Sequence, residues 1–426
     1  MSLAGSPLND WLTRLEKLSP VAIELGLDRV RTVLDRLGPL RPECVLHVAG
    51  TNGKGSSVAM LQALLMASGV RTGSYTSPHV SRYNERICID GREATDAQII
   101  AAFERIEALR GDVPLTYFEF STLAALVVFA EAKIDTAILE VGLGGRLDAV
   151  NVVEPDAGLI TNVSLDHCDW LGNDVETIAF EKAGIMRGGK PIVFGSPEVP
   201  KSVLGHAESI GAQLSLAGRD FDWSLTDDGW TWRGCKHDLA GLDIPSLRGE
   251  MQLANAAGVL ALLEACGLHD LLCKDTVNEA FGRLRLIGRM QSIVADTNWL
   301  LDVAHNPAAA AVLAETLRSD AIEGQTIAIT AMLADKDVDG VIAPLAAVVD
   351  RWIAVTAASP RAIPAADLAR HIANQSDRAC LVAESVQQAI EFAREVATAR
   401  DRILVTGSFY IVGPALEFLD SLPASE

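Results

Sequence analysis

A short glycine-rich segment, Gly50-Thr-Asn-Gly-Lys-Gly-Ser56, offers the clearest chemistry in this sequence. It follows an apolar run at residues 44–48, which predicts a buried strand, and a helical pattern resumes after it. A glycine-rich turn between strand and helix leaves backbone N–H groups free to bind phosphate oxygens, and Lys54 adds a positive charge. The general phosphate-loop spacing is not met, because Val48 and Gly55 stand where a glycine and a hydroxyl residue would be. We interpret the segment as a nucleotide site.

Three further polar groups lie at the carboxyl ends of predicted strands. Thr76-Ser77 ends one strand, Glu140 lies at the tip of a second, and Asp166-His167 follows a third. Taken alone, Glu140 is more simply a solvated strand end and His167 a loop histidine. Beside a phosphate loop, however, they supply hydroxyl, carboxylate and imidazole ligands that suit Mg²⁺, which neutralises nucleotide phosphates. The set therefore predicts a magnesium site.

Lys182 has three interpretations. As a cation it could contact a phosphate, or it could pair with Glu181 on a helix surface. As an uncharged amine near magnesium it could capture carbon dioxide and become an anionic carbamate, because burial and a nearby positive field both lower a lysine pKa. The sequence is compatible with all three.

A second polar cluster, Leu301-Asp-Val-Ala-His-Asn-Pro307, ends a predicted strand in the second half of the chain. Asp302 could bind a ribose hydroxyl, and His305 could stabilise charge on a transferring phosphoryl group. The simpler alternative for both is a structural turn. Arg289 lies in a predicted domain junction, where it could clamp phosphates between domains or form a surface salt bridge.

The elements that must position these groups alternate between strand and helix. In the first half this rhythm predicts a parallel sheet with helices on both faces. Ligands bind outside the carboxyl ends of the strands in such sheets, which is where each polar cluster falls. Strands are predicted at 44–48, 71–77, 137–141, 158–162 and 191–194, and helices near 96–109, 121–132 and 175–185.

Residues 218–250 carry three tryptophans and alternate over short spans, which predicts a small antiparallel appendage, followed by a helix at 252–266. The run 284–291 lacks a helical period and marks a domain junction. We therefore expect an α/β chain with two domains: residues 1–287, with the phosphate loop and a mostly parallel sheet, and residues 288–426, a smaller Rossmann-like α/β domain. Strands of the second domain are predicted at 300–303, 327–331, 352–355, 379–382 and 403–406.

Composition excludes several classes of partner. The 426 residues carry a net charge of −20 without a basic block, so nucleic-acid and anionic-membrane binding are not expected. No signal-peptide pattern and no apolar stretch long enough to span a bilayer are found. The seven cysteines are scattered and contain no CxxC pair, which indicates a reducing compartment. A cytoplasmic location is expected.

Seven segments in this order resemble folylpolyglutamate synthases, most closely the bacterial bifunctional type that is also dihydrofolate synthase. The resemblance runs from about residue 10 to Phe409. The Mur ligases of the same superfamily share the phosphate loop and the His-Asn-Pro element, but Thr76-Ser-Pro-His79 and Leu115-Thr-Tyr-Phe-Glu119 favour the folate branch. The segments are Gly50-Thr-Asn-Gly-Lys-Gly-Ser56, Thr76-Ser-Pro-His79, Leu139-Glu-Val-Gly-Leu-Gly-Gly-Arg-Leu-Asp148, Leu165-Asp-His-Cys-Asp-Trp-Leu-Gly172, Glu181-Lys-Ala-Gly-Ile185, Gly288-Arg-Met-Gln291 and Asp302-Val-Ala-His-Asn-Pro307.

This resemblance implies an ATP-dependent ligase that adds L-glutamate to dihydropteroate or to reduced folates through an acyl phosphate, acting as a monomer with two Mg²⁺ ions. It implies catalytic roles for Lys54, His305 and Lys182, the last as a carbamylated lysine, and magnesium ligation by Ser77, Glu140 and His167. ATP would contact Thr51, Asn52, Gly53, Lys54, Gly55, Ser56, Asn255, Arg289 and Asp302. The pterin would contact Glu24, Leu25, Gly26, Thr116, Tyr117, Phe118, Glu119, Leu147, Asp148 and Ala149.

Two hinge residues depart from the family pattern: Ile287 stands where proline is usual, and Met290 where phenylalanine is usual. Three other functions compete with this interpretation. One is a Mur-type ligase acting on a UDP-sugar peptide, the second is a nucleotide switch controlling a partner, and the third is a folate-binding module without catalysis. The polar cluster of the second domain argues against a switch. An inactive module is disfavoured by four polar residues that are all present: Lys54, Glu140, His167 and His305.

Overall fold

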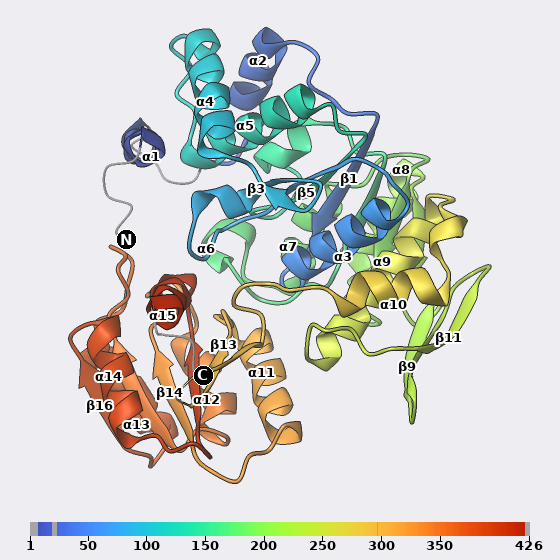
Figure 1. Cartoon of the computed structure of the whole chain (residues 1–426). Coiled ribbons are helices and arrows are strands. Elements are labelled where there is room, and N and C mark those ends of the chain that lie inside the picture. The colour runs from blue at the N-terminus through green and yellow to red at the C-terminus, as the bar shows by residue number, and fades with distance from the viewer. Residues whose placement is uncertain (1–6, 19–23, 296, 422–426) are drawn as a thin grey trace. The chain divides into compact units, whose positions relative to one another are not determined.

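The computed structural model describes residues 7–18, 24–295 and 297–421 (Figure 1). The chain divides into two compact units. Unit 1 comprises Met1–His79, Tyr83–Pro245 and Leu253–Leu284, and unit 2 comprises Val80–Arg82, Ser246–Gln252 and Arg285–Glu426. Among the described helices, none is both long and apolar enough to cross a membrane.

In the described part of unit 1, eight strands form one sheet in the order β4-β3-β2-β5-β1-β6-β7-β8. In this order, all neighbouring strands from β2 through β5, β1, β6 and β7 to β8 are parallel. At one edge, β3 pairs antiparallel with β2 and β4 pairs antiparallel with β3. The mostly parallel sheet is therefore confirmed. The strands are β1 (Cys44–Ala49), β2 (Thr72–Tyr75), β3 (Ile87–Ile89), β4 (Arg92–Glu93), β5 (Thr136–Glu140), β6 (Ala157–Ile160), β7 (Pro191–Phe194) and β8 (Gln213–Leu216).

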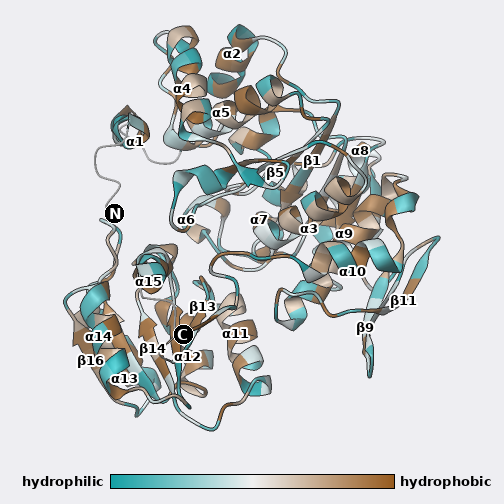
Figure 2. Cartoon of the chain, viewed as in Figure 1, coloured by the Kyte–Doolittle hydropathy of each residue, from teal (hydrophilic) through white to brown (hydrophobic). Residues whose placement is uncertain are grey.

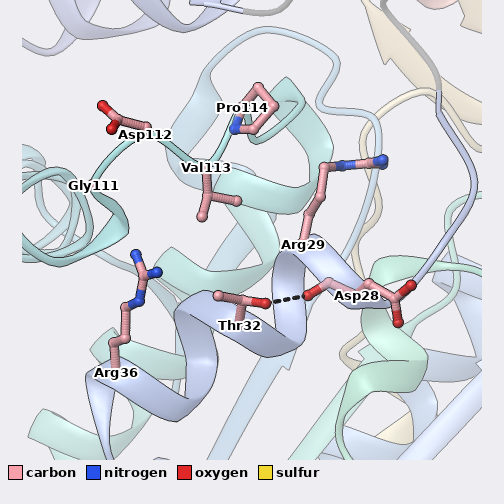
Figure 3. Close-up of a pocket in the computed structure, with 8 residues that line it drawn as sticks. All are labelled: Asp28, Arg29, Thr32, Arg36, Gly111, Asp112, Val113 and Pro114. Atoms are coloured by element: carbon pink, nitrogen blue, oxygen red, sulfur yellow. Dashed lines mark hydrogen bonds between the residues drawn. The ribbon is translucent and has the colours of Figure 1, made fainter.

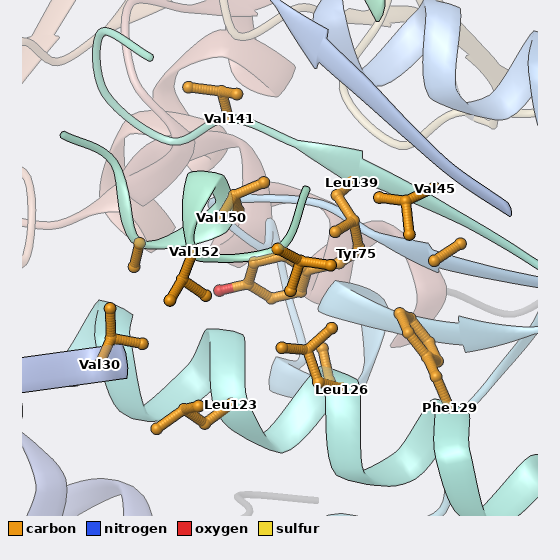
Figure 4. Close-up of a cluster of buried hydrophobic side chains, with 14 of the residues drawn as sticks. Val30, Val45, Tyr75, Leu123, Leu126, Phe129, Leu139, Val141, Val150 and Val152 are labelled. Carbon is orange, nitrogen blue, oxygen red and sulfur yellow. The ribbon is translucent and has the colours of Figure 1, made fainter. Parts of the chain in front are cut away.

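Helices cover this sheet, and α5 is the most apolar of them. Residues 119–129 of α5 are all buried, and Leu123, Leu126 and Phe129 pack towards the sheet around Tyr75 (Figure 4). The helices are α1 (Pro7–Leu18), α2 (Asp28–Leu37), α3 (Lys54–Ala67), η1 (Tyr83–Arg86), α4 (Asp96–Arg110), α5 (Tyr117–Ala132), η2 (Ala149–Val152), α6 (Cys168–Leu171), α7 (Val175–Ala183), α8 (Lys201–Ile210), α9 (Glu250–Ala265), η3 (His269–Leu271) and α10 (Lys274–Gly282).

The predicted start of α5 at residue 121 is four residues late. The side chain of Thr116 accepts a hydrogen bond from the N–H of Glu119 at 3.3 Å, and the carboxylate of Glu119 accepts one from the N–H of Thr116 at 2.7 Å. This reciprocal capping box satisfies donors that a helix start otherwise leaves unpaired. Helix α5 therefore begins at Tyr117.

The predicted antiparallel appendage is confirmed as a three-stranded sheet in the order β11-β10-β9. Its strands are β9 (Asp222–Thr226), β10 (Gly229–Arg233) and β11 (Asp238–Leu242). Trp230 and Trp232 of β10 are buried, and the indole N–H of Trp232 donates to the carbonyl of Ala257 in α9 at 3.2 Å. Strand β9 is largely exposed and hydrophilic (Figure 2). The tryptophans thus anchor the appendage through one face.

Unit 2 has a six-stranded sheet in the order β12-β13-β17-β14-β15-β16, in which all described pairs except β12-β13 are parallel. Alternate residues face opposite layers: Leu300 packs with α11, α12 and α13, whereas Trp299 and Leu301 pack with α14 and α15. The predicted α/β fold of this half is confirmed. The elements are β12 (Gln291–Val294), β13 (Asn298–Leu301), α11 (Pro307–Ser319), β14 (Thr326–Thr330), α12 (Val338–Ala346), β15 (Arg351–Val355), α13 (Ala365–Gln375), β16 (Cys380–Ala383), α14 (Val386–Val396), β17 (Arg402–Thr406) and α15 (Phe409–Ser421).

His47, in the centre of β1, makes the stability of unit 1 sensitive to acid. The ring is fully buried, and burial, with a smaller contribution from Arg187, lowers its pKa from 6.5 to about 3. Below pH 6.5 the unfolded state therefore binds a proton that the folded state does not, so this histidine should lower the unfolding free energy by about 1.4 kcal/mol per pH unit down to about pH 3.

We expect His47→Leu to reduce this pH dependence between pH 6.5 and 4. Urea unfolding of wild type and variant at several pH values, followed by a signal from unit 1, measures the difference in slope. Equal slopes would mean that His47 does not stay neutral in the folded state.

Candidate active site

The loop between β1 and α3 needs glycine at two positions. Gly50 and Gly53 have φ angles of 145° and 83°, which other residues rarely adopt. Close neighbours also block a side chain there: a Cβ would lie 1.9 Å from Thr161 Oγ1 at Gly50 and 2.3 Å from Asn255 Oδ1 at Gly53. The loop is therefore packed closely against Thr161 and Asn255, and α3 begins at Lys54 without a hydrogen bond from a capping side chain.

Residues that follow β6 hold the loop in shape. The N–H of Thr51 donates to the carbonyl of Asn162 at 2.9 Å, and the N–H of Asn52 donates to the side-chain oxygen of Asn162 at 3.1 Å. The hydroxyl of Thr161 donates to the carbonyl of Asn52 at 2.6 Å, and Thr51 and Ser164 exchange two hydrogen bonds. The sequence analysis missed these partners, although they lie at the carboxyl end of the strand next to β1.

Two lysine side chains meet at the carbonyl of Gly50. Lys54 Nζ donates to the carbonyls of Gly50 and Thr51, each at 3.1 Å, and Lys182 Nζ from α7 donates to that of Gly50 at 3.0 Å. Burial, and then the charge of Lys54, lowers the pKa of Lys182 from 10.5 to about 7, against an opposing effect of Asp166 and Asp148. A substantial fraction of Lys182 is therefore uncharged at neutral pH. The surface pair with Glu181 is not formed, because Glu181 instead pairs with Arg146 at 2.8 Å.

A carboxylate lies against the same loop. Glu140, at the end of β5, is buried, and its Oε2 accepts the N–H of Ser77 at 3.1 Å. This oxygen would lie 3.7 Å from a Cβ placed on Gly55. Strands β2 and β5 are parallel neighbours, which is why the two strand ends meet. The Ser56 hydroxyl is also buried and has no hydrogen-bond partner among the described residues, as expected of a group that binds something other than protein.

His167 lies in the segment that follows β6. It adopts a left-handed conformation with φ of 53° at the start of α6, and its side chain is 36% exposed. Asp166 accepts its backbone N–H at 2.8 Å, and the imidazole Nε2 lies 3.8 Å from the Asp166 carboxylate. Within the described residues no group of three or more His, Cys, Asp or Glu side chains could hold a metal ion. A cation held by Glu140 and His167 would also draw on hydroxyl and phosphate oxygens and water, which suits Mg²⁺.

The three segments predicted to contact a pterin are connected. The N–H of Gly26 donates to the carbonyl of Leu147 at 3.1 Å, and Arg29 bonds both Glu24 and Glu119. Phe118 lies over Gly142, where a Cβ would come within 2.5 Å of its ring.

The remaining residues of this set lie around those contacts. Leu25 is half-buried and Ala149 is buried at the start of η2. The ring of Tyr117 packs against Tyr83, with the guanidinium of Arg86 5.4 Å from its centroid. The sequence analysis missed both Arg29 and Arg86.

Asp148 has an unusual environment for a carboxyl group. It is buried and accepts the N–H groups of Leu143 and Val150 at 2.7 and 3.0 Å. Burial raises its pKa to about 7, although these hydrogen bonds and the charge of Lys54 oppose the rise. The charge of Lys54 lowers the pKa of Asp148, and the charge of Asp148 raises the pKa of Lys182. The Leu147–Ala149 segment is therefore electrostatically coupled to the phosphate loop.

In unit 2, two predicted site residues lie near one aromatic ring. The guanidinium of Arg289 lies 5.3 Å from the ring centroid of Phe409, and the imidazole of His305 lies 5.8 Å from the same ring. His305 Nδ1 is 2.7 Å from the carbonyl of Val303, which in a neutral imidazole fixes the proton on Nδ1. Phe409, which organises this cluster, was not among the predicted site residues.

Asp302 holds the backbone of this cluster. Its two oxygens accept the N–H groups of Met290 and Ala304 at 2.9 and 2.8 Å. Burial raises its pKa, against the effect of Arg289. The carboxylate thus joins the turn that contains Arg289 to the end of β13.

Comparisons with known proteins identify the family. The family models described as Mur ligase middle domain and Mur ligase, glutamate ligase domain match residues 48–194 and 288–409. The dihydrofolate synthase/folylpolyglutamate synthase of Escherichia coli K12 is 41% identical, with 98% of this chain and 97% of the relative aligned. The protein of the same name from Mycobacterium tuberculosis is 35% identical, over 92% and 90%. The chain belongs to the folylpolyglutamate synthase family.

Solved structures of the family agree with the fold. An Escherichia coli structure described as FolC with DHPP and ADP is 41% identical and superposes with a TM-score of 0.92 over 99% of both chains. A Yersinia pestis bifunctional folylpolyglutamate synthase/dihydrofolate synthase with AMPPNP and Mn is 42% identical, with a TM-score of 0.90 over 99% of this chain and 100% of that one. A structure of a bifunctional folylpolyglutamate synthase/dihydrofolate synthase with Mn, AMPPNP and L-glutamate bound is 42% identical, with a TM-score of 0.90 over 98% of this chain and 99% of that one.

Membership in the folylpolyglutamate synthase family settles the class of chemistry. This chain is an ATP-dependent, amide-forming ligase of the Mur ligase superfamily, so the predicted resemblance and fold class are confirmed. The first matched range contains Lys54, Glu140 and Lys182, and the second contains Arg289 and His305.

Proposed function

We propose that this ligase adds L-glutamate both to dihydropteroate and to reduced folates. The observation that carries the proposal is the position of Asp148: it belongs to one of the three connected pterin segments and is electrostatically coupled to Lys54 and Lys182 at the phosphate loop. An acceptor held by the pterin segments would therefore lie close to the nucleotide. The relatives crystallised with DHPP and ADP and with L-glutamate support the same ligand classes.

The proposed reaction has two steps. The acceptor carboxylate attacks the γ-phosphate of ATP, which forms an acyl phosphate and releases ADP. The amino group of glutamate then attacks the acyl carbon, which forms the amide and releases phosphate and a proton. The first step brings anions together, so catalysis depends on positive groups that neutralise the phosphates and on exclusion of water.

Each cluster has a proposed task. Lys54 and the amides of residues 53–56 hold the phosphates, with Thr51 and Asn52 completing the loop, Arg289 as a further cation, and Asn255 and Asp302 at the nucleoside. Magnesium would be held by Ser77, Glu140 and His167, and we propose two Mg²⁺ ions. When bound, the ions neutralise the charge of the phosphates. His305 would stabilise the transferring phosphoryl group. Residues 1–287 and 288–426 are the proposed ATP-binding and glutamate-ligase domains.

For Lys182 we propose a carbamate. The uncharged amine would attack carbon dioxide, forming a nitrogen–carbon bond and losing a proton to solvent. A pKa of about 7 provides the uncharged amine at neutral pH. We further propose a cytoplasmic monomer, in line with the free thiols of all seven cysteines.

A product assay tests this function. The enzyme is incubated with ATP, magnesium, L-glutamate and one acceptor at a time, and mass spectrometry counts the glutamates added. Glutamylation of dihydropteroate and of a tetrahydrofolate monoglutamate is expected, with none of a UDP-sugar peptide. Turnover of the UDP-sugar peptide alone would instead identify a Mur-type ligase.

Glu140→Ala should weaken metal use. Removing the carboxylate takes away a proposed ligand and leaves the Ser77 N–H without its acceptor. We expect the magnesium concentration for half-maximal activity to rise about 10- to 100-fold, the range seen when metal-site partners are lost. Magnesium titrations of wild type, Glu140→Ala and the exposed Glu198→Ala control measure the shift. An unchanged titration would remove Glu140 from the metal site.

A further inference from the structure

Arg29, on the first turn of α2, joins two of the pterin segments. Its Nη2 donates to the Glu119 carboxylate at 2.9 Å and to the backbone carbonyl of Glu24 at 3.0 Å, and its Nη1 bonds the Glu24 carboxylate. A longer contact of 3.4 Å joins its Nε to the second oxygen of Glu119. One planar guanidinium thus engages both carboxylates and a main-chain carbonyl, a geometry that lysine cannot reproduce.

The two ends of this bridge differ in exposure. The Glu119 side chain is 3% exposed and that of Arg29 20%, whereas the Glu24 side chain is 49% exposed. Glu119 is also fixed by the N–H of Thr116 in the capping box of α5. The Glu119 end is therefore held in place, and Arg29 connects it to the exposed Glu24–Gly26 segment. The N–H of Gly26 in turn donates to the carbonyl of Leu147.

Arg29 also lines a cavity of about 630 Å³ between α2 and residues 111–114, as Figure 3 shows. Arg36 lines the same cavity two turns along α2, but it donates to the carbonyls of Leu109 and Arg110 at the end of α4. In Figure 3 the two guanidinium groups point in different directions. Arg36 is therefore a matched control: the same residue type, on the same helix and the same cavity, without a contact to a pterin segment.

We propose that Arg29 is a positioning residue for the pterin-bearing acceptor. It fixes the Glu24–Gly26 segment against the start of α5, so that the three pterin segments keep their spacing before the acceptor binds. This rests on the proposed function. A preorganised site spends less binding energy on ordering the loop, so loss of the bridge weakens acceptor binding and leaves nucleotide binding at Lys54 unchanged.

The experiment compares Arg29→Met, Arg29→Lys and Arg36→Met. We expect Arg29→Met to raise KM for dihydropteroate at least tenfold, with smaller changes in kcat and less than twofold changes in KM for ATP and L-glutamate. Arg29→Lys, which keeps the charge without the bidentate geometry, should lie between Arg29→Met and wild type. Arg36→Met should match wild type.

Calorimetric binding of dihydropteroate to enzyme saturated with ADP gives a second readout that needs no turnover. A tenfold weaker affinity in Arg29→Met supports the positioning role. Equal affinities, an equal effect of Arg36→Met, or parallel losses for all three substrates overturn it. Wild-type enzyme that binds ADP but not dihydropteroate, and glutamylates no pterin, would overturn the proposed function itself.

Because Arg29→Met also leaves the buried Glu119 without its cation, which is destabilising, Glu24→Gln provides an independent test. This variant breaks only the exposed end of the bridge and keeps the Arg29–Glu119 pair. We expect KM for dihydropteroate to rise about threefold or more in Glu24→Gln and the loss to be non-additive in the Glu24→Gln, Arg29→Lys double variant. Additive losses would show that the two residues act separately.

Discussion

Lys54→Ala is expected to abolish ligation while the protein stays folded. Lys54 is the cation at the start of α3, at the positive end of the helix, where it can neutralise the phosphates during attack by an anionic carboxylate. Loss of one preorganised donor to developing charge typically costs 10²- to 10³-fold in rate, and we expect a loss of about 10³-fold or more in kcat/KM. Product formation under single-turnover conditions is the measurement.

The fold should tolerate this change. Lys54 Nζ donates to the carbonyls of Gly50 and Thr51, and its charge disfavours the protonated form of Lys182, so its removal also relieves repulsion. Circular dichroism and thermal unfolding should match wild type, and the exposed Lys201→Ala serves as control. Normal turnover in Lys54→Ala would exclude this lysine from the mechanism, and an unfolded variant would show that its role is structural.

Lys182→Ala is expected to lose about 10²-fold or more in kcat and to recover part of it when a short carboxylate such as acetate is added. The expectation follows from the proposed carbamate, because an added carboxylate can occupy the space and charge of the missing group. Activity measured against acetate concentration, at fixed ionic strength, gives the extent of recovery. Lys190→Ala, whose lysine pairs with Asp156 on the surface, should show neither loss nor rescue.

The titration of Lys182 offers a second test. The pKa of Lys182 is about 7 in the folded state, against the ordinary value of 10.5, so the unfolded state binds more protons between pH 7 and 10.5. The contribution of Lys182 to the unfolding free energy therefore increases as pH rises through this window. Wild type should therefore gain stability relative to Lys182→Ala from pH 7 to 10. The carbamate would be refuted by an unmodified lysine in intact-protein mass measured under carbon dioxide, together with no acetate rescue.

Local patterns predicted the elements that position the site. The strand before Gly50, the polar residues after β2 and β5, and the βα rhythm of both halves are all contained in short stretches of sequence. The start of α5 was also readable, since Thr116 and Glu119 have capping-box spacing, but the apolar run from residue 121 dominated the prediction. Strands β3 and β4, with three and two residues, are too short for a period to appear.

Contacts between distant segments could not be predicted in this way. Arg29 meets Glu119 across 90 positions, and Thr161 meets Asn52 across 109. Phe409 gathers Arg289 and His305 although it lies at the far end of unit 2 in sequence. Each of these residues has an ordinary sequence neighbourhood, and only the folded chain places it beside the site.

The placement of Asn255 against Gly53 limits how this protein can be dissected. The whole eight-stranded sheet is complete by Leu216, yet the amide that walls the phosphate loop comes from α9, beyond the tryptophan-rich appendage. A shortened version ending after β8 would keep every strand and every lysine of the loop but would lose that wall. The nucleotide-binding part is therefore not a portable module, and engineering that transplants or trims it must carry the chain through residue 265.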